Sequence, residues 1–388
     1  MTRIHSYALN RPPGYLWIVI PAMLVLLLGA CAGDQRREQS SDLQTCHVVF
    51  DAGSSGTRLY IYRQSGSGWV RHDGPKTGAL ADPVRSRRGK TMADAGDVTA
   101  DIVALLDDWF DEGPPKKSGS PKWLAFDWWS LCRVESASVY ATAGMRLAEL
   151  EYPDKAEKIW AMLNRRLSNR LDMEVTTRTL SGFEEGLFAW LAVREGQADG
   201  QFGVAEMGGA SAQVTLPCDS CEDSRPVTVQ GRELRIYSGS YLGLGQDEMW
   251  KKLVNRSACK RAVGLENPQW RVMDCTDGIE LSAEFQTDAR IIASHPGIDR
   301  WFLAGAFRYT RASDIDNYCR DNVNSGHNPK SSCFRAIYQS LVLNSLGIPV
   351  SSELSDADWT LGAVICDIGS CLSYAGPPEC AWSPRGCL

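Results

Sequence analysis

The feature that most constrains the fold of this chain is a strand–turn–strand pattern that occurs twice. The first copy is His47-Val-Val-Phe-Asp-Ala-Gly-Ser-Ser-Gly-Thr-Arg58, and the second is Phe202-Gly-Val-Ala-Glu-Met-Gly-Gly-Ala-Ser-Ala-Gln213. Each copy has an apolar run, an acid, one spacer, a glycine, small residues and a polar side chain. Glycine lets a turn approach a ligand closely, and consecutive backbone N–H groups bind anions. The repeat predicts two phosphate-binding hairpins, one in each of two lobes.

The acid at the end of each apolar run, Asp51 or Glu206, cannot contact a phosphate directly because like charges repel. Its natural task is to hold a divalent cation, directly or through water, since carboxylate oxygens are ligands of Mg²⁺ and Ca²⁺. Either hairpin alone would be a weak signal, because many tight turns have this composition. Two hairpins of matching form, far apart in one chain, indicate nucleotide binding between two lobes.

Two further segments offer groups for catalysis. In Tyr140-Ala-Thr-Ala-Gly-Met-Arg146, Thr142 offers a hydroxyl for a metal-bound water and Arg146 an anchor for carboxylates or phosphates. The alternative is a plain strand-to-helix connection. In Gly182-Phe-Glu-Glu-Gly186, Glu184 and Glu185 lie at a helix start, where acids favour the helix dipole. The functional interpretation makes one of them a general base that deprotonates an attacking water.

The rest of the chain alternates strands with helices, which predicts an α/β fold. Periodicity predicts strands over 46–63, 136–142 and 201–217, and helices over 97–110, 155–170, 184–195 and 334–346. Residues 64–95 and 113–122 are rich in Gly, Ser and Pro and are expected to be irregular.

Four of these segments, in order, resemble the first four conserved regions of the nucleoside triphosphate diphosphohydrolase (apyrase) family. They are Asp51-Ala-Gly-Ser-Ser-Gly-Thr-Arg58, Ala141-Thr-Ala-Gly-Met-Arg146, Gly182-Phe-Glu-Glu-Gly186 and Met207-Gly-Gly-Ala-Ser-Ala-Gln213. Trp359-Thr-Leu-Gly362 resembles the fifth region, and Ser240-Tyr-Leu-Gly-Leu-Gly245 and Cys333-Phe-Arg-Ala-Ile-Tyr338 resemble other landmarks. The resemblance runs from about residue 46 to about residue 365, which is nearly all of the expected mature chain.

The resemblance implies a fold of the actin/Hsp70/sugar-kinase superfamily, with two ribonuclease-H-like lobes and an active-site cleft between them. It implies hydrolysis of terminal phosphates of nucleoside tri- or diphosphates such as ATP, ADP and GTP, with Mg²⁺ or Ca²⁺. Glu185 matches the catalytic base, and Ser211 and Gln213 match residues that position the attacking water. The first phosphate loop is matched by Ser54, Ser55, Gly56, Thr57 and Arg58, and the second by Gly208, Gly209, Ala210 and Ser211. The residues that match those around the metal, mostly through water, are Asp51, Glu206 and Thr142, and Arg146 matches a supporting residue of the site.

The chain departs from the family pattern at three positions. Glu206 stands where the family usually has Asp, and its extra methylene moves the carboxylate. Ala212 replaces a common threonine, and Gln246 stands where many relatives carry a basic residue near the nucleobase or ribose. Contact with the base is therefore the weakest inference. Phe307-Arg-Tyr309 offers a stacking face, although an aromatic core segment is the favoured interpretation.

The N-terminus predicts export with a lipid anchor. Arg3 and Arg11 precede an apolar run over 15–28, which is short for a membrane span, and the box Leu-Gly-Ala-Cys31 has the form of a lipoprotein cleavage site. The alternative is a short transmembrane anchor. We expect Cys31 to be lipidated, and Ala32 in the second mature position favours the outer membrane, facing the periplasm or the cell surface. The expected organisation is a signal peptide (1–30), a tether (31–44), a first lobe (45–181), a second lobe (182–354) and a return to the first lobe (355–388).

The other twelve of the 13 cysteines form an even set, which in an exported chain predicts disulfides. Cys259 with Cys275 and Cys319 with Cys333 are plausible local bridges, although connectivity does not follow from sequence. Cys218-Asp-Ser-Cys221 has the spacing of a redox pair or half a zinc site, but no second Cys-x-x-Cys with zinc spacing exists. A structural disulfide framework is the favoured interpretation.

The net charge of −6 argues against nucleic-acid binding, because no basic excess is available to neutralise a phosphate backbone. Three rival functions fit parts of the sequence. An exopolyphosphatase or guanosine pentaphosphate phosphatase of the same superfamily is disfavoured by the export signal. A non-catalytic, actin-like nucleotide switch would not need Glu185, and a surface interaction protein would not need the intact acid–Gly–Ser–Gln constellation.

Overall fold

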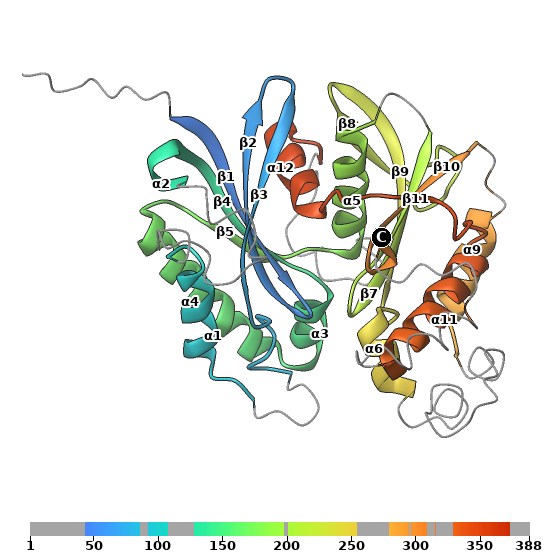
Figure 1. Ribbon diagram of the computed structural model, residues 1–388, viewed down its shortest axis with the longest axis horizontal. Coiled ribbons are helices and arrows are strands. Elements are labelled where there is room, and N and C mark those ends of the chain that lie inside the picture. The colour runs from blue at the N-terminus through green and yellow to red at the C-terminus, as the bar shows by residue number, and fades with distance from the viewer. Residues whose placement is uncertain are drawn as a thin grey trace, which may run out of the picture. The chain divides into compact units, whose positions relative to one another are not determined.

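The computed structural model describes residues 43–85, 92–107, 128–197, 201–253, 279–293, 295, 297–308, 315 and 329–372. Figure 1 shows two β-sheets with two helices between them and further helices on their other faces. All of this belongs to one compact unit that begins at Gln44. Within the described residues, no helix is both long and apolar enough to cross a bilayer. The predicted signal peptide, tether and lipidated Cys31 lie outside the described residues.

The first sheet has the strand order β3-β2-β1-β4-β5. Its central strand, β1, pairs antiparallel with β2 on one side and parallel with β4 on the other. The strands are β1 (Gln44–Gly53), β2 (Gly56–Ser65), β3 (Gly68–Thr77), β4 (Cys132–Ala141) and β5 (Thr176–Thr179). Because β1 is buried on both faces, seven of its ten residues are buried in an unbroken run rather than in alternation.

The second sheet repeats this arrangement, with the order β11-β10-β6-β7-β9-β8. Its strand β6 pairs antiparallel with β7 and parallel with β10, as β1 does with β2 and β4. The strands are β6 (Phe202–Met207), β7 (Ser211–Pro217), β8 (Arg225–Val229), β9 (Arg232–Leu242), β10 (Arg300–Gly305) and β11 (Glu353–Leu354). The sequence repeat therefore corresponds to a repeated β-unit, and each copy forms the first hairpin of its own sheet.

The two helices between the sheets are α5 (Gly182–Glu195) and α12 (Trp359–Gly369), as Figure 1 shows. Residues 183–193 of α5 are all buried, because the helix packs against β6, β7 and β9 on one side and α12 on the other. From Gly186 to Val193 the helix is apolar all round, which is the expected form for such a position. At Gly362 a Cβ would lie 1.8 Å from Phe188 O, so glycine is what lets the two helix backbones approach this closely.

The remaining helices complete two outer cores. In the first, α1 (Ala95–Ala104) packs on α4 (Pro153–Leu171), and α3 (Ala143–Glu151) joins β4 to α4. Around the second sheet lie α6 (Gln246–Leu253), α9 (Ala283–Ala293) and α11 (Pro329–Ser345). The short helices are α2 (Trp128–Leu131) and η2 (Ala306–Arg308). A third core, between the two sheets, surrounds α5 and α12.

Most of the predicted elements are confirmed, and two predictions were wrong. The segment expected to be irregular over 64–95 contains β3, an edge strand that pairs only with β2. Its Gly68 and Pro75 weakened the strand signal, but an edge strand tolerates a proline that donates no hydrogen bond. The helix expected over 97–110 ends at Ala104, and residues 105–107 form a turn. The loop expected over 113–122 lies outside the described residues.

Three disulfides lie in the described part of the chain: Cys46–Cys132, Cys218–Cys221 and Cys366–Cys371. The first joins β1 to β4, and the last closes the C-terminal end of α12. The predicted bridges Cys259–Cys275 and Cys319–Cys333 fall on side chains that the structure does not describe.

Candidate active site

The two repeated segments fold into β-hairpins with corresponding registers. In the first, Asp51 lies opposite Arg58, and Gly53 opposite Gly56, with Ser54 and Ser55 in the turn. In the second, Glu206 lies opposite Gln213 and Met207 opposite Ala212, with Gly208, Gly209, Ala210 and Ser211 at the turn. Gly208 N donates to Ser211 O at 2.9 Å, which closes this turn. The acid and the polar residue of each copy therefore face each other across the hairpin.

The two turns lie against each other. A Cβ at Gly209 would lie 2.6 Å from Ser54 Oγ, so the second turn approaches the first as closely as glycine allows. A Cβ at Gly144, at the start of α3, would lie 2.9 Å from Ser54 Cα. Small residues at these positions therefore let three backbone segments meet. The structure brings together the two predicted phosphate loops and the segment that contains Thr142.

Glu185 is the centre of a buried polar cluster in the first turn of α5. Only 4% of its surface is exposed. Its Oε2 atom accepts hydrogen bonds from the Arg146 guanidinium and, at 3.0 Å, from Gln213 Nε2. Burial raises the pKa of the Glu185 carboxyl above its ordinary value, and the charge of Arg146 opposes this shift. A carboxylate with a raised pKa and fixed orientation is suited to accept a proton near neutral pH.

Ser211 and Gln213 join this cluster from strand β7. Gln213 Nε2 lies 2.7 Å from Ser211 Oγ and 3.1 Å from Ser240 Oγ, and Arg146 Nη2 lies 3.3 Å from Ser211 Oγ. Gln213 Oε1 is buried and has no hydrogen-bond partner among the described residues. The cluster thus holds a free acceptor and a hydroxyl beside the Glu185 carboxylate. Three residues predicted from two separate motifs, Glu185 from one and Ser211 and Gln213 from the other, are brought into direct contact.

Glu184, the neighbouring acid, has a different task. Its carboxylate accepts from Ser181 N at 2.9 Å, and its backbone N–H donates to Ser181 Oγ at 3.2 Å, which forms a capping box at the start of α5. It also pairs with Arg178 at 2.8 Å. Of the two interpretations of the acid pair, helix capping applies to Glu184, whereas Glu185 faces the hairpins.

The acids of the hairpins form a second cluster with Asp358. Burial raises the pKa of Asp51 to about 7, with Asp358 adding to the shift and Arg58 opposing it. Burial also raises the pKa of Glu206 well above its ordinary value, and repulsion from Glu185, Asp358 and Asp51 adds to it. Several carboxylates that destabilise one another's charged forms favour binding of a cation, which would relieve this repulsion.

The space that the Glu206 side chain occupies depends on a glycine at the end of β10. Its Oε2 atom is buried and has no hydrogen-bond partner among the described residues. A Cβ at Gly305 would lie 2.4 Å from Glu206 Oε1, and Gly305 has φ +60°, which disfavours other residues. The longer side chain at position 206 is therefore accommodated by Gly305 from the neighbouring strand.

Asp358 was missed by the sequence analysis. It caps α12, where its Oδ1 accepts from Thr360 N at 3.0 Å. The signal that could have found it is its position directly before Trp359-Thr-Leu-Gly362, the segment that resembles the fifth conserved region. Ser240 contacts both Arg146 and Gln213, and it too had no role assigned from sequence.

The other predicted loop residues differ in their surroundings. Arg58 lies in β2, and its Nη1 pairs with Asp51 Oδ2 of β1 at 3.2 Å. Thr57 is fully buried, and its Oγ1 has no hydrogen-bond partner among the described residues. Thr142 is buried at the N-cap of α3, makes no side-chain capping bond, and donates its N–H to Ala52 O at 3.4 Å. Its hydroxyl is thereby held near the end of β1, which carries Asp51.

Two residues considered for base contact support the fold instead. Gln246 N donates to Gly208 O at 3.1 Å, and the Gln246 side chain accepts from Gln339 Nε2 at 3.3 Å, so this residue holds the second turn. Phe307 is 2% exposed and belongs to the core of the second sheet, as the favoured interpretation expected. Tyr309 lies outside the described residues.

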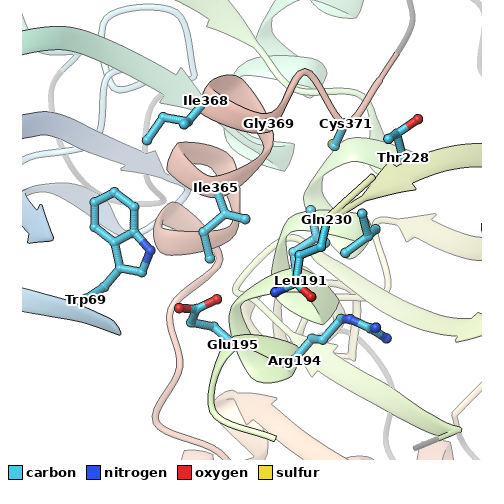
Figure 2. A pocket seen from close by; sticks show the side chains of 11 residues that line it. Trp69, Leu191, Arg194, Glu195, Thr228, Gln230, Ile365, Ile368, Gly369 and Cys371 are labelled. Carbon is cyan, nitrogen blue, oxygen red and sulfur yellow. The ribbon is translucent and has the colours of Figure 1, made fainter. Parts of the chain in front are cut away.

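A separate pocket lies at the far ends of α5 and α12 (Figure 2). Arg194 and Glu195 are nine and ten residues beyond Glu185, which is about 14 Å along a helix. Trp69, Leu191 and the isoleucines of α12 give the pocket an apolar wall. It is therefore distinct from the polar cluster, and its lining offers no comparable set of acids and hydroxyls.

Comparison with known proteins identifies the family that this geometry resembles. Residues 129–287 match the GDA1/CD39 (nucleoside phosphatase) family. The chain is 25% identical over 232 residues to ectonucleoside triphosphate diphosphohydrolase 1 of Mus musculus, which covers 53% of this chain and 42% of that protein. It is 30% identical over 227 residues to probable apyrase 6 of Arabidopsis thaliana, covering 54% and 38%. The predicted resemblance to the nucleoside triphosphate diphosphohydrolases is confirmed, although the match spans less than half the length of these relatives.

The fold is also similar to solved structures. The Ppx/GppA family member of Aquifex aeolicus superposes with a TM-score of 0.50 at 13% identity, covering 84% of this chain and 97% of that one. This likeness supports the predicted α/β fold with two sheets and their helices, and concerns the fold alone.

Proposed function

Taking the resemblance to nucleoside triphosphate diphosphohydrolases as the premise, we propose that this protein hydrolyses terminal phosphates of nucleoside tri- and diphosphates. ATP, ADP and GTP represent the substrate class. The observation that carries the proposal is the contact of two glycine-rich turns beside one buried cluster of Glu185, Ser211 and Gln213. A polyanion held by the turns would place its terminal phosphorus next to a carboxylate that can accept a proton.

The turns supply the phosphate-binding groups. Backbone N–H groups of the first turn, with the hydroxyls of Ser54 and Ser55, and those of Gly208 to Ala210 would surround the phosphate oxygens. Glycine at position 209 keeps the two turns close, since any side chain there would meet Ser54. Binding from both sides would orient the terminal phosphate for in-line attack.

Glu185 would act as the general base. Water that donates to Glu185 and contacts Ser211 Oγ and Gln213 Oε1 would be aligned toward the phosphorus by groups already fixed in the structure. As the oxygen–phosphorus bond forms, one proton of that water passes to Glu185. The bond between the terminal phosphorus and the bridging oxygen breaks, and the nucleoside di- or monophosphate leaves with that oxygen. Arg146 holds the carboxylate in place and stabilises its charged form before the transfer.

The acidic cluster fits a hard divalent cation such as Mg²⁺ or Ca²⁺. Its donors are all carboxylates, from Asp51, Glu206 and Asp358, and Glu206 Oε2 has no protein partner among the described residues. These residues would hold the ion, mostly through water, with the Thr142 hydroxyl close by. When bound, the ion would offset the charge of the phosphates.

We further propose that the protein acts outside the cytoplasm, anchored by a lipid on Cys31. The three disulfides of the described part and the lipoprotein-like N-terminus support this location. Mass spectrometry of the membrane-extracted protein should find a diacylglyceryl adduct on Cys31, and Cys31→Ser should release the protein from the membrane fraction. Membrane retention of the Cys31→Ser variant would contradict the lipid anchor.

The test of the activity is a panel of phosphate release from ATP, ADP, GTP and polyphosphate, each with Mg²⁺, with Ca²⁺ and with EDTA. We expect release from the nucleotides that requires the metal. Release from polyphosphate alone would favour the exopolyphosphatase alternative. Nucleotide binding without any release would contradict an enzyme and favour a binding protein.

A further inference from the structure

A second cluster of reactive side chains lies at the opposite end of strand β7. The strand carries Ser211 and Gln213 at its start and leads directly into Cys218 at its end. Seven residues of extended chain span about 23 Å. The Cys218-Asp-Ser-Cys221 loop is therefore well separated from the proposed active site, and its chemistry is independent of the proposed function.

The cluster consists of two sulfurs and one imidazole. Cys218 and Cys221 form a disulfide in this structure, and His295 Nδ1 lies 3.8 Å from Cys218 Sγ. The ligand atoms of Cys218, Cys221 and His295 all lie within 4.8 Å of one another. His295 is held there by the end of α9, where its N–H donates to Ile292 O at 3.1 Å. Two different elements thus bring a histidine onto a Cys-x-x-Cys loop.

Exposure decides which sulfur an incoming thiol can reach. Cys218 is 2% exposed, whereas Cys221 is partly exposed. A small-molecule or protein dithiol would therefore attack Cys221 Sγ as a thiolate, and the Cys218 sulfur would leave as a thiolate. Ser220 Oγ and His295 Nδ1 each lie 3.8 Å from that sulfur and are close enough to stabilise it. The second thiol of the reductant then displaces Cys221, which leaves two cysteine thiols and one oxidised dithiol.

Reduction converts the cluster into a set of metal ligands. Two thiolates and an imidazole are donors typical of Zn²⁺, with zinc–sulfur bonds of about 2.3 Å and zinc–nitrogen bonds of about 2.1 Å. Around a tetrahedral ion these bond lengths place the donor atoms roughly 3.6–3.8 Å apart. The 3.8 Å between His295 Nδ1 and Cys218 Sγ already matches this separation, whereas the two sulfurs, bonded to each other in the disulfide, move apart once it is reduced. Asp219, Glu222 and Asp223 are exposed in the same loop and add negative charge around it. In the disulfide form the sulfurs are not thiolates and cannot bind the ion in this way.

We propose that Cys218, Cys221 and His295 form a redox-gated site for a thiophilic divalent cation of the Zn²⁺ class. The disulfide closes the site, and reduction by a dithiol opens it. Three protein ligands leave a fourth position for water or another small ligand.

The test measures binding of Zn²⁺ and Co²⁺ to the full chain in two redox states. Protein is reduced with a phosphine, freed of reductant without air and titrated beside untreated protein. Reduced protein should bind one more equivalent of Zn²⁺ than the reduced Cys218→Ser/Cys221→Ser variant, and Co²⁺ should give a thiolate charge-transfer band. His295→Ala should bind at least about tenfold more weakly, because one of three ligands is lost.

A matched control removes a different short-range disulfide. The Cys366→Ser/Cys371→Ser variant lacks a disulfide of similar sequence separation that, within the described part of the chain, has no histidine grouped with its sulfurs, and it should keep the added equivalent. Equal Zn²⁺ binding by reduced wild type and Cys218→Ser/Cys221→Ser would overturn the site. Equal affinity of His295→Ala and wild type for this added equivalent would overturn the three-ligand set, and the same added equivalent in the oxidised protein would overturn the redox gate. His295→Ala keeps both cysteines, so it tests the site even where the serine variant fails to fold.

Discussion

The two hairpins have the same register but balance the charge of their acids differently. In the first, Arg58 lies opposite Asp51 and pairs with it at 3.2 Å. In the second, Gln213 takes the position opposite Glu206, donates to the cluster around Glu185, and leaves Glu206 Oε2 without a partner among the described residues. The second hairpin has thus exchanged charge compensation for a contact with the proposed base. Its carboxylate is the one that most needs an external cation.

Among the acids of the two hairpins, the largest effect is expected from this unbalanced carboxylate. Glu206→Gln keeps the shape of the side chain but removes the charge, so we expect metal-dependent phosphate release at a fixed low Mg²⁺ concentration to fall by about 10²-fold. Glu206→Asp, the residue usual in the family, should keep most of the rate once Mg²⁺ is raised. A Mg²⁺ titration of both variants checks this. An unchanged Mg²⁺ dependence in Glu206→Gln would remove Glu206 from the metal site.

Protonation should compete with the metal. Because the pKa of Asp51 is raised to about 7 in the metal-free protein, binding of a divalent cation must displace a proton below that pH. The apparent dissociation constant for Mg²⁺ should fall about tenfold per pH unit as pH rises from 5 to 7, for each proton displaced. Calorimetric titration in buffers of different ionisation enthalpy measures the proton release directly. A dissociation constant that does not change over this range would contradict the raised pKa.

The same shifts predict how the stability of the metal-free protein depends on pH. A carboxyl whose pKa is higher in the folded state binds protons more strongly there, so the free energy of unfolding falls as pH rises from the unfolded value through the folded one. For Asp51 this window runs from about 4 to about 7, with a slope of at most about 1.4 kcal/mol per pH unit. Urea unfolding at pH 5 and pH 7.5 checks this. Saturating Mg²⁺ should flatten the profile, and a profile that rises with pH in its absence would be inconsistent with these shifts.

The smallest effect is expected from the compensated hairpin. Arg58 is about one-third exposed, so its ion pair with Asp51 should contribute less than about 1 kcal/mol to stability. Arg58→Gln should therefore unfold at nearly the same urea concentration as wild type. Its clearer result should be a higher pKa of Asp51, seen as a shift of the Mg²⁺ titration toward higher pH. No shift would mean that Arg58 does not set the charge of Asp51.

The features that could be predicted from sequence are local patterns, whereas contacts between segments far apart in the sequence could not be predicted. Both hairpins were predictable because the acid, the glycines and the flanking strands lie within twelve residues of one another. Glu185 was identified as one of two adjacent acids. The capping box explains why the other acid, Glu184, serves the start of α5 and not the hairpins. The assignments of phosphate, metal and catalytic roles remain predictions.

The rest depended on how distant segments meet. Asp358 follows Asp51 by more than 300 residues, and its place beside the hairpin acids comes only from the packing of α12 between the two sheets. Residue type alone could not show that Arg58 forms an ion pair with Asp51, or that the backbone N–H of Gln246 donates to the second hairpin turn. The edge strand β3 was hidden by its glycine and proline, which a strand with one free edge tolerates.

The most direct measurement of the central claim is the rate of phosphate release from ATP by Glu185→Gln, with Glu184→Gln as the matched control. The control changes the adjacent acid of the same helix turn, which caps the helix and pairs with Arg178. With Mg²⁺ saturating, Glu185→Gln should lose on the order of 10²-fold or more in kcat, the scale of a general base, and Glu184→Gln should stay within about threefold of wild type. Wild-type kcat in Glu185→Gln, or equal losses in the two variants, would contradict the assignment of Glu185 as the base between the hairpins.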